Sequence, residues 1–149
     1  MKRIVLLFGC ALIFAPAFQA VAAEGLDPAK LLQPPVDSWP TYNGDYSGRR
    51  FSTLSKINDS NVKSLSLAWL YRMNGAQDPY GGVIKATPLV VNGIMYFTVP
   101  DKVWAIDART GREVWNYTWQ SKGGIHLGNR GVGIYGNWLY FEKIGRAHV

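Results

Sequence analysis

Residues 87–98 read TPLVVNGIMYFT, two apolar runs rich in β-branched and aromatic side chains on either side of Asn92-Gly93. Asn-Gly is the strongest short signal for a two-residue β-hairpin, because both central turn residues take positive φ angles that asparagine and glycine tolerate. Pro88 stands near the start of the first run, where no N–H is needed for the ladder. We therefore predict a hairpin with strands over residues 87–91 and 94–98.

Two more strands are predicted immediately after the hairpin. Residues 102–107 have strand composition, residues 108–111 read ARTG and predict a turn, and residues 112–118 predict a fourth strand. Four consecutive strands joined by short turns form an antiparallel meander.

A faint repeat connects this meander with its flanks. The run GIMYF at residues 93–97 is echoed by NWLYF at residues 137–141, so that Tyr96 and Tyr140 lie 44 residues apart. Trp69 and Trp115 are 46 residues apart, each near a predicted strand. Periods of about 40–50 residues with four strands per unit are typical of β-propellers. The predicted fold class is all-β, a β-propeller of which this chain holds about one full blade plus parts of two others.

The region before the meander has weaker signals. Residues 24–37 form a proline-containing segment, called here the lead-in, which predicts loop with one helical turn. Residues 58–61 read NDSN, good capping residues for another single turn. Residues 67–72 have strand composition. Because one blade cannot bury both of its faces alone, we expect the chain to depend on neighbouring blades for stability.

The first 23 residues are typical of a secretory signal peptide. Lys2 and Arg3 provide the positive start, residues 4–18 are apolar, and residues 20–22 read AVA, a small-residue cleavage site. A retained anchor is the alternative, but the apolar stretch is shorter than the ~20 residues of a spanning helix. We expect a periplasmic protein with no membrane span in the mature chain. The single cysteine, Cys10, would leave with the signal peptide.

The last residues are predicted to be an artefact of sequence assembly. Residues 144–149 read IGRAHV, the translation of a common short-read sequencing adapter, and Lys143 fits the preceding bases. A genuine tail is the alternative. We exclude residues 143–149 from the fold, do not consider His148 a ligand, and expect the natural protein to continue past Glu142.

The formal charge of +6 does not indicate nucleic-acid binding. Residues 24–142 contain 12 basic and 10 acidic side chains, and the longest basic run there is the pair Arg49-Arg50. Nucleic-acid-binding proteins carry a basic stripe or patch. We therefore expect no nucleic-acid partner.

Residues 105–115 read AIDARTGREVW, which resembles the tryptophan-docking motif of quinoprotein dehydrogenases, A-x-D-x-x-T-G-x-x-x-W. The motif matches at Asp107, Thr110, Gly111 and Trp115. Asp107 can accept hydrogen bonds from N–H groups of the turn, which Gly111 allows to be tight. The resemblance implies that Trp115 wedges between neighbouring blades, and Trp69 is the corresponding tryptophan of the preceding unit. Ordinary core packing is the alternative for Trp115 alone.

The resemblance extends over residues 38–142. Trp39, Phe51 and residues 57–69 are similar to the family's N-terminal region, which supplies an outer strand that closes the propeller against its last blade. The resemblance implies eight blades around an axial pyrroloquinoline quinone (PQQ), with calcium or a lanthanide beside the quinone. It also implies oxidation of an alcohol or related hydroxyl compound, with electrons passed to a cytochrome c.

Asn129-Arg130-Gly131 resembles a motif of methanol-dehydrogenase-like members whose arginine binds PQQ, which makes Asn129 and Arg130 candidate cofactor residues. A planar guanidinium can form bidentate, charge-assisted bonds to the three carboxylates of PQQ without losing its proton. A surface ion pair is the alternative for Arg130.

Two positions depart from that subgroup. Gly124-Ile125 stand where it has an adjacent cysteine pair, and Lys85 stands where a carboxylate is common. Lys85 could pair with a PQQ carboxylate or be a solvated residue at the start of a strand. His126, in a glycine-rich loop, could donate to the cofactor or be an ordinary polar surface group.

No catalytic residue or metal ligand is predicted within this chain. The resemblance implies that the general base and the metal ligands lie beyond Glu142. Two other functions stay open: a non-enzymatic propeller that acts as a protein-binding scaffold in the cell envelope, and a propeller that binds polysaccharide or another ligand. Fold alone does not separate these functions.

Overall fold

The computed structural model describes residues 25–73, 84–119 and 129–141. Predictions for the signal peptide, for Gly124-Ile125, for His126 and for residues 143–149 lie outside the described residues. The strands are β1 (Leu89–Val91), β2 (Ile94–Val99), β3 (Lys102–Asp107), β4 (Glu113–Thr118), β5 (Val132–Tyr135) and β6 (Trp138–Phe141), and the 3-10 helices are η1 (Pro28–Leu32) and η2 (Val62–Ser64).

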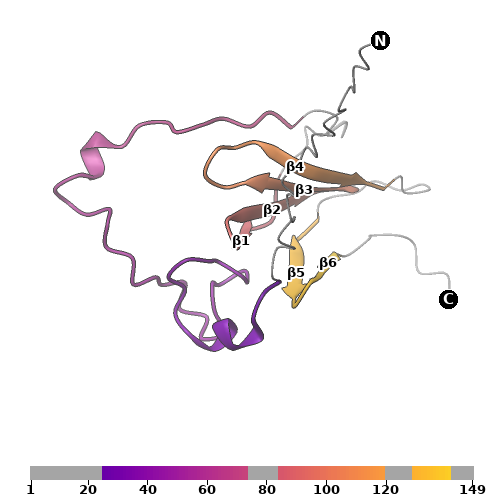
Figure 1. Cartoon of the computed structure of the whole chain (residues 1–149), viewed down its shortest axis with the longest axis horizontal. Coiled ribbons are helices and arrows are strands. Elements are labelled where there is room, and N and C mark those ends of the chain that lie inside the picture. The colour runs from indigo at the N-terminus through magenta and orange to yellow at the C-terminus, as the bar shows by residue number, and fades with distance from the viewer. Residues whose placement is uncertain (1–24, 74–83, 120–128, 142–149) are drawn as a thin grey trace, which may run out of the picture.

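The predicted meander is confirmed as a four-stranded antiparallel sheet in the order β1-β2-β3-β4 (Figure 1). The turn between β1 and β2 has φ angles of 50° at Asn92 and 76° at Gly93, as a two-residue hairpin turn requires. The first strand is shorter than predicted, because it begins at Leu89, after Pro88. Proline has no N–H to give to the ladder.

A tight turn joins β3 to β4, as predicted. The Asp107 carboxylate accepts hydrogen bonds from the backbone N of Arg109 at 2.9 Å and of Thr110 at 3.0 Å. The N–H of Gly111 donates to the Asp107 carbonyl at 2.8 Å, and Gly111 has a φ of 71°. Next to this turn, the register between β3 and β4 shifts between Ala105 and Ile106.

One face of the sheet carries an aromatic cluster. Phe97 of β2 and Trp104 of β3 stack with centroids 5.3 Å apart, and Val99 and Ile106 are buried beside them. Trp69, Tyr71 and Met73 pack against this cluster from outside the sheet. Residues 69–73 therefore cover this face.

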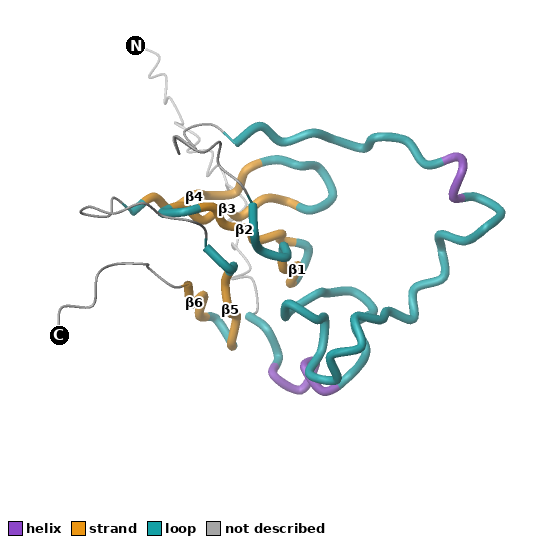
Figure 2. The backbone as a smooth tube through the Cα atoms, turned by 180° about the vertical axis from the view of Figure 1, so that it is seen from behind, coloured by secondary structure: helices purple, strands orange, loops and turns teal. Residues whose placement is uncertain are grey.

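The opposite face is covered by the lead-in and by the second hairpin. Leu26 and Leu31 form a buried cluster with Val91, and Ile134 of β5 packs against it. The N–H of Leu26 bonds the Gly136 carbonyl at 2.8 Å, so the lead-in contacts the turn between β5 and β6. Figure 2 shows this hairpin beside the four-stranded sheet.

The predicted echo of residues 93–97 at residues 137–141 is confirmed by that second hairpin, whereas Trp69, the earlier member of the tryptophan pair, lies in no strand. Strands β5 and β6 pair in an antiparallel register from Val132–Phe141 to Tyr135–Trp138 around the Gly136 turn. Tyr96 lies in β2 and Tyr140 in β6, the second strands of the β1–β2 and β5–β6 hairpins. The chain is thus starting the same strand pattern again.

The chain just after the lead-in is anchored to β1. Trp39 and Val90 exchange two backbone hydrogen bonds of 2.7 and 2.9 Å. The predicted helical turn is η1, where the Asp27 side chain accepts from the N–H of Ala29 at 3.0 Å. Within the described ranges, no helix combines the length and the hydropathy that crossing a membrane requires.

One predicted strand is wrong. The segment of residues 67–72 is extended but belongs to no strand, and no described strand lies in register with it. The physical reason is that strand composition creates a strand only where a neighbour completes the backbone ladder. Leu67 and Leu70 are strongly exposed, whereas Trp69 and Tyr71 pack on the sheet. The preceding helical turn, η2, is confirmed.

Candidate functional site

The Asn129-Arg130-Gly131 loop immediately precedes β5 and is held by the side chain of its first residue. Asn129 is only 6% exposed, and its Oδ1 accepts a hydrogen bond from the Thr98 hydroxyl at 2.7 Å. The same oxygen accepts from the N–H of Gly131, also at 2.7 Å. Arg130, between these two anchored residues, is exposed.

The structure brings this loop beside the segment that carries Lys85. Gly131 has a φ of 112°, and a Cβ placed on it would lie 3.2 Å from the Cβ of Ala86. The backbone at Gly131 therefore passes directly against the residue after Lys85. Lys85 is itself exposed. Two predicted cofactor segments, far apart in sequence, thus meet just before β1 and β5 begin.

This arrangement suits an anionic ligand. Arg130 supplies a planar guanidinium with several fixed donors, and Lys85 supplies an ammonium group that acts as a point charge. Asn129 is buried, and its Oδ1 accepts from Thr98 and Gly131; its role in cofactor binding stays a prediction. Within the described ranges, no three His, Cys, Asp or Glu side chains gather as a metal site would require.

Four of the five predicted docking residues meet at the β3–β4 turn, namely Trp69, Asp107, Thr110 and Gly111. The indole Nε1 of Trp69 donates to the Ala108 carbonyl at 3.1 Å, and the Trp69 ring lies so close to Gly111 that a Cβ there would approach it to 2.6 Å. Hydrogen bonds from the turn N–H of Thr110, and next that of Arg109, lower the pKa of Asp107. The wedge role between blades stays a prediction for both tryptophans.

Trp115 has a different setting from Trp69. It is 39% exposed, and its ring centroid lies 6.0 Å from that of Tyr96.

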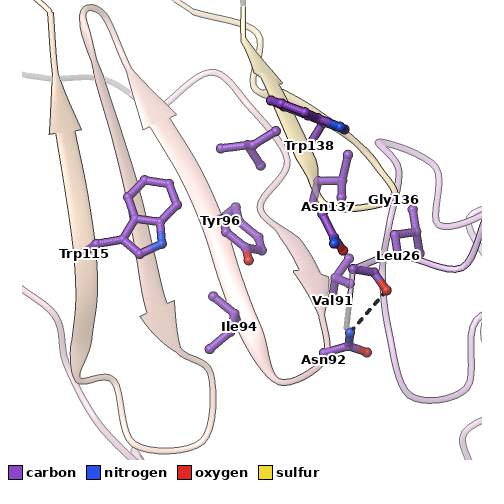
Figure 3. A pocket seen from close by; sticks show the side chains of 12 residues that line it. Leu26, Val91, Asn92, Ile94, Tyr96, Trp115, Gly136, Asn137 and Trp138 are labelled. Carbon is purple, nitrogen blue, oxygen red and sulfur yellow. Dashed lines mark hydrogen bonds between the residues drawn. The ribbon is translucent and has the colours of Figure 1, made fainter. Parts of the chain in front are cut away.

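Trp115 also lines a hollow between the sheet and the second hairpin. Its volume is about 220 Å³, and Figure 3 shows Tyr96 and Trp115 on the sheet with Trp138 on the hairpin across from them. A second, more apolar space of about 420 Å³ lies between β4 and β6, lined by Tyr117, Leu139 and Phe141 among others. Neither space is lined by Lys85 or Arg130.

Sequence reasoning missed a polar contact on the other face. The Tyr71 hydroxyl donates to the Glu113 carboxylate, which also accepts from the Asn116 side chain at 2.6 Å. Burial, and then the bond to Glu113, raises the pKa of Tyr71 to about 12. The bond from Tyr71, and then that from Asn116, lowers the pKa of Glu113. No local pattern links residues 42 positions apart, so only the folded chain reveals this pair.

Sequence reasoning also missed Thr98, whose hydroxyl holds Asn129. The only signal was a threonine among the apolar residues of β2, and threonine is common in strands for its β-branched shape alone.

A family model described as the β-propeller domain of PQQ-type glucose/ethanol/alcohol dehydrogenases matches residues 39–140. The chain belongs to this family. This PQQ-family chain is 38% identical over 146 residues to a quinohemoprotein alcohol dehydrogenase of Comamonas testosteroni, covering 89% of the chain and 20% of that relative. It is 39% identical over 80 residues to a 1-butanol dehydrogenase (cytochrome c) of Thauera butanivorans, covering 53% of the chain and 11% of the relative.

A solved structure shares the architecture. The quinohemoprotein alcohol dehydrogenase ADHIIG from Pseudomonas putida HK5 matches with a TM-score of 0.65 and 34% identity, over 78% of this chain and 18% of that one. The PQQ-family chain is therefore an all-β protein that forms part of a β-propeller. It spans about a fifth of the length of the curated quinohemoprotein relative.

Proposed function

We propose that this chain is the N-terminal part of a PQQ-dependent dehydrogenase that oxidises an alcohol or related hydroxyl compound in the periplasm. The observation that carries the proposal is the contact between Gly131 and Ala86, which places the segments of Arg130 and Lys85 side by side. Family membership alone would not require that this chain keep two cations at that place.

The residues present fit PQQ. The cofactor has three carboxylates, and Arg130 would bind one of them through paired N–H groups. Lys85 would add a second positive charge. When bound, PQQ supplies an ortho-quinone that accepts a hydride from the substrate. Asn129 would act indirectly, by holding the loop on which Arg130 stands.

The remaining assignments follow from the family. We propose that residues 1–23 are a signal peptide, 24–37 a lead-in, 38–142 the first part of an eight-bladed propeller, and 143–149 an adapter artefact. The N-terminal region that includes Trp39, Phe51 and residues 57–69 would supply the outer strand that closes the propeller against its last blade. Calcium or a lanthanide, and the general base, would be held by residues beyond this chain.

A cytochrome c is the proposed electron acceptor. Its support is the name of the Thauera butanivorans relative, a 1-butanol dehydrogenase (cytochrome c).

The test is PQQ binding by the complete protein in the presence of Ca²⁺. Titration with PQQ is monitored by the quenching of protein fluorescence, which gives the Kd. Arg130→Ala should raise the Kd by about tenfold or more, because a charge-assisted bond contributes about 1.5–3 kcal/mol. Arg109→Ala is the matched control, since Arg109 is an exposed arginine in the β3–β4 turn, and it should bind as the unaltered protein does.

Two results would oppose the proposal. An unaltered Kd in Arg130→Ala would remove Arg130 from the site. Failure of the unaltered protein to bind PQQ would favour the protein-binding scaffold.

A further inference from the structure

Thr98 is a buried polar side chain in the middle of the blade. Its relative exposure is 0%, its neighbours Phe97 and Val99 are also buried, and it pairs with Val103 of β3. A hydroxyl group removed from water is costly unless it finds a hydrogen-bond partner. The partner here is Asn129, which lies 31 residues further along the chain and just before β5.

A single oxygen connects the blade with the Arg130 loop. Asn129 Oδ1 accepts from the Thr98 hydroxyl and from the N–H of Gly131, both at 2.7 Å. The first bond fixes Asn129 to β2, which is paired with β1 and β3, and the second fixes Gly131 to Asn129. Both neighbours of Arg130 are therefore held in place. The positive φ of Gly131 and its approach to Ala86 complete the placement of the loop.

We propose that Thr98 is a positioning residue for Arg130, which sets the loop in its binding geometry before the anionic cofactor arrives. This inference rests on the proposed function, because it takes Arg130 as the cofactor ligand. A loop that is ordered in advance loses less conformational entropy on binding than one that must be ordered by the ligand. The hydroxyl of Thr98 therefore contributes to affinity without touching the cofactor.

The first measurement is PQQ affinity in the complete protein with Ca²⁺, again by fluorescence titration. Thr98→Val keeps the β-branched shape and removes the donor, so we expect the Kd to rise about five- to tenfold, the size expected for one lost hydrogen bond. Thr98→Ser keeps the donor and should restore the affinity. Thr118→Val is the matched control, because it makes the same change at an exposed position at the end of β4.

A double-mutant cycle separates positioning from general weakening of the fold. Asn129→Ala removes the acceptor from the other side, and Thr98→Val combined with Asn129→Ala should bind no more weakly than Asn129→Ala alone. Additive losses in Kd would contradict a shared anchor. Circular dichroism of each variant identifies any that fails to fold. If Thr98→Val is such a variant, the Kd values of Thr98→Ser and Asn129→Ala are compared instead.

The second measurement needs no cofactor. Hydrogen exchange of the Gly131 amide, followed by mass spectrometry of the cofactor-free complete protein, should be faster in Thr98→Val than in Thr118→Val. Faster exchange with weakened binding supports the inference. Unchanged exchange, or unchanged affinity in Thr98→Val while Arg130→Ala binds weakly, overturns it and leaves the proposed function intact. Normal binding by Arg130→Ala removes Arg130 as the cofactor ligand and overturns the inference about Thr98 with it.

Discussion

The indole N–H of Trp69 donates to the carbonyl of Ala108 at 3.1 Å, and the Trp69 ring covers Gly111 of the same turn. Trp69 belongs to an extended segment outside the sheet, whereas Ala108 and Gly111 connect β3 to β4. The contact thus connects Trp69 with a turn of the blade that lies 39 residues later in the chain. In the described residues, the segment of Trp69 has no strand partner of its own. It combines one directed bond with apolar packing, and the two contributions can be separated by substitution.

Trp69→Phe and Trp69→Ala should destabilise the complete protein to different extents. Phenylalanine keeps a ring over Gly111 but has no N–H, so we expect a loss of about 1 kcal/mol in the free energy of unfolding. Alanine also removes the ring, and the expected loss is about 2–4 kcal/mol. Urea unfolding monitored by far-UV circular dichroism measures both. Equal losses would show that the ring contributes little beyond its bond to Ala108.

Gly111→Ala should be far more damaging than the same change at Gly48. The two glycines have φ angles of 71° and 72°, so the backbone strain of an alanine is the same at both positions, roughly 1–2 kcal/mol. A Cβ at Gly48 meets nothing within 4 Å, whereas one at Gly111 would lie 2.6 Å from the Trp69 ring. We expect the free energy of unfolding to fall by about 1 kcal/mol in Gly48→Ala and by about 3 kcal/mol or more in Gly111→Ala.

The comparison uses urea unfolding of the two variants under one set of conditions. Adding Trp69→Ala to Gly111→Ala should remove most of the excess, because the ring that obstructs the new methyl group is then gone. Similar losses in the two single variants would mean that the Trp69 ring moves aside freely.

Tyr71→Phe should change how stability depends on pH at both extremes. The folded pKa of Glu113 lies below its ordinary value of 4.5, so the stabilisation by this pair is present above 4.5 and lost as pH falls through the lowered value. The folded pKa of Tyr71 is raised from 10.0 to about 12, so the stabilisation is present below pH 10 and lost as pH rises toward 12.

The difference in unfolding free energy between the unaltered protein and Tyr71→Phe should therefore be largest between about pH 5 and 9.5. We expect at most about 1 kcal/mol there, because the Glu113 carboxylate is exposed and water screens it. Urea unfolding across the pH range measures the difference, with Tyr117→Phe as control for loss of an exposed hydroxyl. A difference that stays constant from pH 3.5 to 11 would be incompatible with a bond to an ionised Glu113.

Arg130→Lys tests whether the shape of the cation matters as well as its charge. Lysine keeps the positive charge but not the paired donors of a guanidinium, so PQQ should bind about three- to tenfold more weakly than to the unaltered protein and more tightly than to Arg130→Ala. Fluorescence titration of the complete protein measures the three Kd values, and Arg112→Lys, at an exposed arginine, is the control. Identical affinities for lysine and arginine would indicate a point-charge contact without bidentate geometry.

The four-stranded sheet could be predicted because its determinants are local. Apolar runs, Asn92-Gly93 and the Asp107-to-Gly111 turn each specify strand or turn within a few residues, and the predicted meander is confirmed. The echo of residues 93–97 at residues 137–141 lies in a strand, β6, as the repeat suggested. The extended segment of residues 67–72 was predicted as a strand for the same local reasons. It forms none in the described chain, because a ladder also needs a partner that composition cannot supply.

Sequence alone determined the blade, its turns and the two candidate cations, since strand composition, turn chemistry and charge are properties of neighbouring residues. Tertiary structure alone decided that the segments of Lys85 and Arg130 lie together, that Thr98 holds Asn129, and that Tyr71 bonds Glu113. The physical reason is that these contacts join residues 31 to 45 positions apart, at distances set by the packing of one sheet against its neighbours. No local pattern in the sequence specifies that packing.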